Sequence, residues 1–85
     1  MYHIDWRTKA YRQLYKIRSR QTREEIYNAV ETLRRWPDCR NVKALAGHDY
    51  GYRMRVGDWR ILFDVQDRIR IIMIQEVKKR DERTY

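Results

Sequence analysis

Residues 52–63 read YRMRVGDWRILF, an alternation of apolar and basic side chains interrupted by Gly57 and Asp58. Alternation with a period of two is typical of a half-buried strand, and glycine accepts the positive φ that a two-residue hairpin turn requires. The stretch therefore predicts two antiparallel strands joined by a tight turn, in a register that places Arg55 opposite Arg60.

The two faces of this hairpin differ in character, because successive side chains of a strand point to opposite sides of a sheet. The face expected to pack on the core carries Tyr52, Met54, Val56, Trp59, Ile61 and Phe63. The other face carries Arg53, Arg55, Arg60 and Leu62. Its three guanidinium groups lie within about 5–8 Å of one another, and like charges directly opposite destabilise a sheet. A bound anion explains this arrangement. In the alternative interpretation, the arginines extend over the sheet with Asp64 or Glu76 as a counter-ion.

The residues before the hairpin change from a strand period to a helical one. Residues 2–6 alternate as a short strand, and from about Thr8 the apolar positions follow a helical period. After a break at residues 18–21, the segment from Thr22 to Glu25 is a capping box, which predicts the start of a second helix that ends before Pro37. The tight connection predicts an αα-hairpin.

The residues around and after the hairpin complete the sheet. Residues 41–47 form a connector that should anchor Val42 and Leu45 in the core. A second turn at residues 66–67 leads into a last strand over residues 68–77, which is apolar on both faces and should be central. The order β-α-α-β-β-β predicts an α+β fold, with a two-helix hairpin packed on a mainly antiparallel twisted sheet. We expect residues 1–85 to form one domain.

Charge is the strongest feature of the composition. Lys and Arg number 20 against 12 Asp and Glu, a net charge of +8, and fifteen of the cations are arginine. Arginine suits bidentate phosphate contacts, so a polyanion such as nucleic acid or an acidic protein is the expected partner.

The longest apolar run, residues 71–74, is far too short to span a membrane, and the N-terminus lacks the apolar stretch of a signal peptide. The single Cys39 excludes an internal disulfide. We expect a cytoplasmic protein without a metal or other cofactor.

The C-terminal tail is also rich in lysine and arginine. The last strand should deliver the cations of the tail, together with an aromatic ring, to the same end of the sheet as the hairpin arginines. These tail residues are Lys78, Lys79, Arg80, Arg83 and Tyr85.

Three stretches of the chain resemble the RelE/ParE toxin superfamily of bacterial toxin–antitoxin systems, and more closely its RelE branch. They are KALAG at residues 43–47, the hairpin at 52–63, and VKKRDERTY at 77–85. The resemblance implies the β-α-α-β-β-β fold of that superfamily. It also implies a metal-independent endoribonuclease that cuts mRNA in the ribosomal A site, and an acidic, partly extended antitoxin as a partner beside the ribosome and mRNA.

The resemblance also implies roles for individual residues. The family's catalytic positions fall on Arg55, Arg60, Arg80 and Tyr85, and RNA-binding roles fall on Arg53, Lys78, Lys79 and Arg83. Attack of a 2′-hydroxyl on the adjacent phosphate builds charge on the phosphoryl oxygens, which fixed cations stabilise. A tyrosine can stack on a base, and Arg80 is placed to assist the leaving group.

The general base is the point where this chain departs from RelE. RelE carries lysines on the first hairpin strand where this chain has Arg53 and Arg55, and arginine does not lose its proton in proteins. His48 is the candidate base, with Lys78, Lys79 and Glu82 as further candidates. Positioning and electrostatics are the alternative source of catalysis.

Two other functions fit the same residues. One is a ParE-like inhibitor of gyrase, which acts by binding protein and needs no nuclease site. The other is a non-catalytic RNA-binding module of the same fold, which should bind RNA with a steep dependence on salt.

Overall fold

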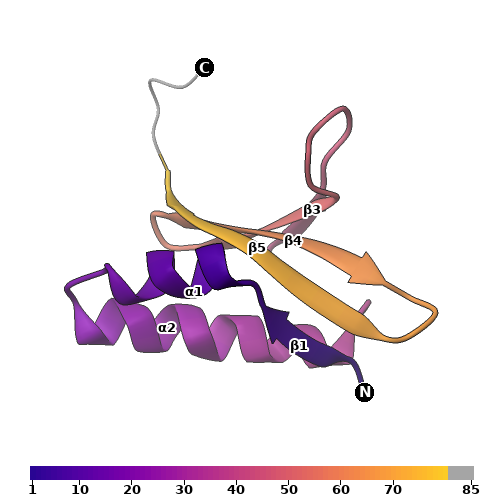
Figure 1. Cartoon of the computed structure of the whole chain (residues 1–85), viewed down its shortest axis with the longest axis horizontal. Helices are drawn as coiled ribbons and strands as arrows, with labels where there is room; N and C mark the ends of the chain where they lie inside the picture. The colour runs from indigo at the N-terminus through magenta and orange to yellow at the C-terminus, as the bar shows by residue number, and fades with distance from the viewer. Residues whose placement is uncertain (81–85) are drawn as a thin grey trace.

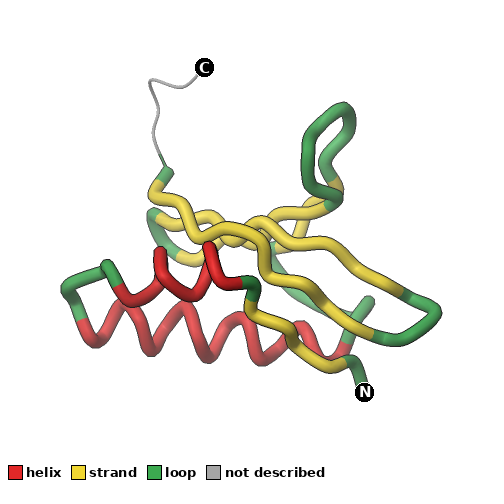
Figure 2. Tube along the Cα trace, viewed as in Figure 1, coloured by secondary structure: helices red, strands yellow, loops and turns green. Residues whose placement is uncertain are grey.

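The computed structural model describes residues 1–80 as two layers, with two helices lying against one face of a twisted sheet (Figures 1 and 2). The elements in chain order are β1 (His3–Trp6), α1 (Thr8–Tyr15), α2 (Arg20–Glu31), the 3-10 helix η1 (Thr32–Arg35), β2 (Val42–Ala44), β3 (Tyr52–Val56), β4 (Trp59–Gln66) and β5 (Ile71–Lys79). The α+β class and the helical hairpin on the sheet are as the sequence predicts.

The sheet has five strands in the order β1-β5-β4-β3-β2. β1 runs parallel to β5, and the other neighbours are antiparallel. β5 therefore lies between β1 and β4, which confirms the inner position predicted from its apolar Ile71–Ile74 segment. Its side chains alternate between fully buried Ile72 and Ile74 and partly buried neighbours.

The β3–β4 hairpin has the register that the sequence predicts. Val56 pairs with Trp59, and Arg55 pairs with Arg60. Gly57 in the turn has φ 56°, a conformation that costs a residue with a Cβ roughly 1–2 kcal/mol. The glycine therefore fixes the turn, and the turn fixes which side chains share a face.

The core lies between the helices and the predicted apolar face of the hairpin. Met54, Ile61 and Phe63 from the sheet are buried against helix residues such as Leu14 and Ile26. Burying one such side chain contributes about 1.5–3 kcal/mol, so this face anchors the sheet and leaves the opposite face available for other groups.

The start of α2 differs from the sequence-based prediction. The helix begins at Arg20, with Ser19 as its N-cap, and the Ser19 Oγ accepts a hydrogen bond of 3.1 Å from the Thr22 amide. The predicted capping box at Thr22 is therefore wrong. Ser19 is also a good capping residue, and its use as the N-cap in place of Thr22 adds three residues to the helix.

The connector between helix and hairpin also differs. It contains a three-residue edge strand, β2, in which Val42 packs against the core as expected. Leu45 is only partly buried and faces a pocket on the other side of the sheet, so its predicted place in the core is wrong. Pairing with β3 orients the connector, because Val42 lies beside buried Met54.

None of the helices within residues 1–80 is both long and apolar enough to cross a membrane.

Candidate functional site

Two rows of side chains cross the sheet on the face opposite the helices. Residues paired across neighbouring strands lie on the same face, so the strand register alone defines these rows. One row consists of Arg55, Arg60 and Lys78, and the next consists of Lys43, Arg53, Leu62 and Glu76. Cations thus occupy five of the seven positions, and Leu62 provides an apolar centre that is only 5% exposed.

A pocket of about 500 Å³ lies over these rows. Its size falls within the range of small-molecule binding sites. The loop after β2 contributes one wall and the end of β5 contributes another; in Figure 1 this loop projects from the sheet on the side away from the helices. The lining residues are Lys43, Leu45, His48, Arg53, Arg55, Arg60, Leu62 and Arg80. We call this site the cationic pocket.

Among the residues that the structure describes, the charged side chains that line the cationic pocket are all basic. Five of its described lining residues are Lys or Arg, and none is Asp or Glu. Within residues 1–80 neither Arg53 nor Arg55 forms an ion pair with a carboxylate. Concentrated positive charge on a surface with little compensation attracts phosphate groups.

The two acids proposed as counter-ions bind other groups. Asp64 accepts hydrogen bonds from the Gly51 amide at 2.7 Å and from Gln75 Nε2 at 3.1 Å. Glu76 forms ion pairs with Lys9 and Lys78 at 3.4 and 3.7 Å. The arrangement therefore favours the anion-binding interpretation over simple neutralisation by these two acids.

Arg80 lines the cationic pocket from the position directly after Lys79, the last residue of β5. The Arg80 amide donates a 2.6 Å hydrogen bond to the carbonyl oxygen of Asp58, in the β3–β4 turn. This contact joins the end of β5 to the hairpin, and it brings the side chains of Arg55, Arg60 and Arg80 to one site from three separate strand ends.

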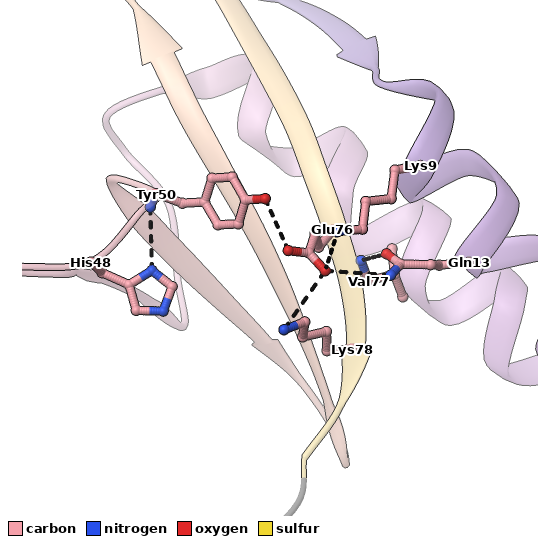
Figure 3. A network of polar contacts seen from close by, with 7 residues as sticks. All are labelled: Lys9, Gln13, His48, Tyr50, Glu76, Val77 and Lys78. Carbon is pink, nitrogen blue, oxygen red and sulfur yellow. Dashed lines mark hydrogen bonds and ion pairs between the residues drawn. The ribbon is translucent and has the colours of Figure 1, made fainter. Parts of the chain in front are cut away.

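His48 lines the cationic pocket from the loop between β2 and β3. Its Nδ1 atom accepts a 3.2 Å hydrogen bond from the Tyr50 amide. A neutral imidazole carries one proton, so Nδ1 as acceptor places that proton on Nε2. His48 therefore presents a hydrogen-bond donor, and Figure 3 shows its second ring nitrogen on the side away from the Tyr50 amide.

Glu76 ties three parts of the fold together next to this site (Figure 3). Tyr50 donates a 2.9 Å hydrogen bond to Glu76 Oε2, and Gln13 Nε2 donates one of 3.4 Å to Oε1. Burial opposes ionisation, but the hydrogen bonds from Tyr50 and Gln13 and the charges of Lys78 and Lys9 outweigh it, so the pKa of Glu76 is lowered. The same hydrogen bond to Glu76 is the main reason that the pKa of Tyr50 is raised.

The structure brings together five of the residues expected from the sequence to form the site, which are His48, Arg53, Arg55, Arg60 and Arg80. Lys78 lies on the same face but pairs with Glu76 beside the pocket. Lys79 pairs with Trp59, on the opposite face of the sheet, and so is separated from the site. Arg83 and Tyr85, and with them Glu82, lie outside the described residues.

Sequence reasoning missed Lys43 and Leu45 as parts of the site, and Tyr50 and Glu76 as its supports. The alternation of Lys43 with Val42 was a signal for a strand beside Arg53, but three residues are too few to establish a period. No local pattern marks the Tyr50–Glu76 contact. Within residues 1–80, no three His, Cys, Asp or Glu residues cluster closely enough to hold a metal ion.

Known structures share this fold at low sequence identity. RelE in the archaeal RelE–RelB complex from Pyrococcus horikoshii OT3 superposes with a TM-score of 0.80 and 22% identity, over 95% of this chain and 97% of that one. For the RelBE2 toxin–antitoxin complex of Mycobacterium tuberculosis, the TM-score is 0.78 and the sequence identity is 24%. The match covers 93% of this chain and 98% of that one. For the isolated E. coli RelE toxin, the TM-score is 0.80 and the sequence identity is 18%. The match covers 96% of this chain and 87% of that one.

Sequence comparison identifies the family directly. A search of curated protein sequences gives no match. The family model for the ParE toxin of the type II toxin–antitoxin system parDE, in contrast, matches residues 4–84, nearly the whole chain. The chain therefore belongs to the ParE toxin family of the RelE/ParE superfamily, as a type II toxin with the RelE fold.

Proposed function

We propose that this toxin is a metal-independent endoribonuclease that cleaves mRNA in the ribosomal A site, in the cytoplasm. The observation that carries the proposal is the cationic pocket, in which Arg53, Arg55, Arg60 and Arg80 converge from three strands with no acid in the described lining. RNA supplies both the phosphate that such a pocket attracts and the 2′-hydroxyl that can attack it.

The reaction exchanges one phosphorus–oxygen bond for another. The 2′-oxygen bonds to the adjacent phosphorus, the bond to the 5′-oxygen breaks, and the products carry a 2′,3′-cyclic phosphate and a 5′-hydroxyl. The 2′-hydroxyl proton passes to water in the open pocket, and water supplies a proton to the 5′-oxygen. Charge grows on the phosphoryl oxygens during this exchange, where Arg55 and Arg60 stabilise it.

The other pocket residues support this step. Arg80, held beside the hairpin turn by its backbone hydrogen bond to Asp58, stabilises the departing 5′-oxygen. Arg53 and Lys43 bind the neighbouring phosphate. From the family resemblance, the proposal also keeps Tyr85 as a base-stacking residue and Arg83 and Lys78 as further RNA contacts. Lys79 is not part of this site, because it pairs with Trp59 on the opposite face of the sheet.

An antitoxin is the expected protein partner. The solved complexes from Pyrococcus horikoshii and Mycobacterium tuberculosis each contain a toxin of this fold with its antitoxin. For this chain we propose an acidic, partly extended antitoxin that covers the cationic pocket, because opposite charge both guides association and blocks RNA.

Gyrase inhibition is the second candidate, and the match to the ParE family model favours it. A toxin that acts by binding gyrase has no need for converging arginines beside an open pocket. The two functions therefore differ in what loss of Arg60 should do to nucleic-acid cleavage.

The test is primer extension on mRNA in a programmed ribosome complex, with and without EDTA. We expect discrete A-site cuts by the unmodified chain that persist in EDTA and disappear in Arg60→Ala. Arg68→Ala is the matched control, because Arg68 is exposed in the turn at the opposite end of β4. Inhibition of gyrase supercoiling without any cuts would support the second candidate, and RNA binding without either activity would support a non-catalytic module.

A further inference from the structure

The wall of the cationic pocket that carries His48 is held to the sheet by two side-chain contacts. The Gly51 amide donates to Asp64 Oδ1 on β4, and the Tyr50 hydroxyl donates to Glu76 Oε2 on β5. The second contact joins residues 26 positions apart in the chain. The position of this loop over the arginines therefore depends on these two hydrogen bonds to the sheet.

Glu76 is an unusual residue for its place in the sheet. It is 6% exposed, in a row whose next member is the apolar Leu62. Burying a carboxylate is costly unless hydrogen bonds and charges compensate it, and an apolar residue is often tolerated as well or better for stability. In the part of the chain that the structure describes, the hydrogen bond to Glu76 Oε2 comes from the Tyr50 hydroxyl.

Tyr50 connects this carboxylate to His48 (Figure 3). Its hydroxyl is fixed by Glu76, and its amide is the donor that occupies His48 Nδ1. Fixing both ends of Tyr50 sets the plane of the imidazole and keeps its proton on Nε2. The His48 ring, which carries this Nε2 atom, lines the cationic pocket together with lysine and arginine side chains.

We propose that His48 is a phosphate-binding residue that donates a hydrogen bond from Nε2 to RNA in the cationic pocket, and that Tyr50 and Glu76 are the positioning residues that orient it. The inference rests on the proposed function for its ligand, RNA. It assigns His48 in this tautomer a donor role in place of proton abstraction through Nε2, because that nitrogen already holds a proton.

Histidine NMR tests the geometry without any activity. In the 15N-histidine-labelled chain at about pH 8, where imidazole is ordinarily neutral, we expect His48 to have a protonated Nε2 and an unprotonated Nδ1. Tyr50→Phe should give a mixture of both tautomers, while exposed His3 serves as the internal reference. A protonated Nδ1 in the unmodified chain, or no change in Tyr50→Phe, would overturn the positioning role.

RNA binding tests the donor role separately from cleavage. A trinucleotide with methylated 2′-hydroxyls cannot undergo the reaction, so it reports binding alone. We expect it to shift the His48 Nε2 resonance and to bind His48→Ala about tenfold more weakly than the unmodified chain. An unchanged Nε2 resonance at saturation would overturn the inference even if the protein cleaves ribosomal mRNA, whereas absence of cleavage alone would contradict only the proposed function.

A double-mutant cycle tests whether Tyr50 acts through His48. Tyr50→Phe should weaken binding of the same trinucleotide several-fold in the unmodified background and leave it within about twofold in the His48→Ala background. Tyr2→Phe is the matched control, because it removes a similar hydroxyl contact, to Asp67, outside the pocket. Equal losses in both backgrounds would show that Tyr50 acts independently of His48 and would overturn the positioning role.

Discussion

Arg55 and Arg60 face each other directly across the β3–β4 hairpin. Two guanidinium groups in this position repel each other, since like charges at directly opposite sheet positions are destabilising. The repulsion is retained in a small chain whose net charge is already +8. In the proposed function, a phosphate bound between the two guanidinium groups offsets this repulsion.

Arg55→Gln should raise the free energy of unfolding by a few tenths of a kcal/mol to about 1 kcal/mol in low salt, because it removes the repulsion and keeps a polar side chain of similar reach. Urea denaturation at low and high salt measures the change, and the gain should shrink as salt screens the charges. A loss of stability would instead assign Arg55 a structural role.

Ser19→Ala should cost about 1 kcal/mol of stability, because it removes the side-chain acceptor for the first turn of α2. Thr22→Ala is the matched comparison and should cost less than half as much, since Thr22 contributes its backbone amide to this contact. Urea titration of both variants distinguishes the observed cap from the capping box suggested by the sequence. Equal costs would contradict the Ser19 cap.

Gly57→Ala should destabilise the protein by about 1–2 kcal/mol, because its φ of 56° is unfavourable for a residue with a Cβ. A Cβ built at this position meets no atom within 4 Å, so the whole cost comes from the backbone. Asp58→Ala, at the next position of the turn, should change stability by no more than about 0.5 kcal/mol. Thermal and urea unfolding of the two variants provide the comparison.

Glu76 should make stability depend on pH in the acid range. Its pKa is lowered in the folded state from the ordinary value of 4.5, so the unfolded chain binds its proton first as the pH falls. The stabilisation is therefore complete above about pH 5 and is lost as the pH falls through the folded-state pKa. Urea midpoints between about pH 7 and 3 should fall less steeply for Glu76→Gln than for the unmodified chain, and parallel curves would contradict this role of Glu76.

The hairpin could be predicted in full because its signals are local. Gly57 sets the turn, and five alternating positions on either side then fix every pair from Tyr52–Phe63 to Val56–Trp59. The same register identifies Arg53, Arg55 and Arg60 as neighbours on one face. These are the residues that form the floor of the cationic pocket.

The parts that could not be predicted depend on contacts between distant segments. β2 spans only three residues and is defined by its pairing with β3, so Lys43 could not be placed beside Arg53. The last strand continues to Lys79, two residues beyond its predicted end, and this added length places Lys79 on the helix side. The loop carrying His48 is positioned by Tyr50 and a glutamate 26 residues further along the chain.

The most direct test of the account is the single-turnover rate of A-site mRNA cleavage at saturating toxin, measured for the unmodified chain, Arg60→Ala and Arg68→Ala. Loss of one transition-state donor typically costs about 10²–10³-fold, so Arg60→Ala should be slower by that factor while Arg68→Ala retains the full rate. The free energies of unfolding of the two variants, measured by urea denaturation, should agree within about 0.5 kcal/mol. Cleavage by Arg60→Ala at the unmodified rate, or no cleavage by the unmodified chain, would contradict the central claim that the cationic pocket is a ribonuclease site.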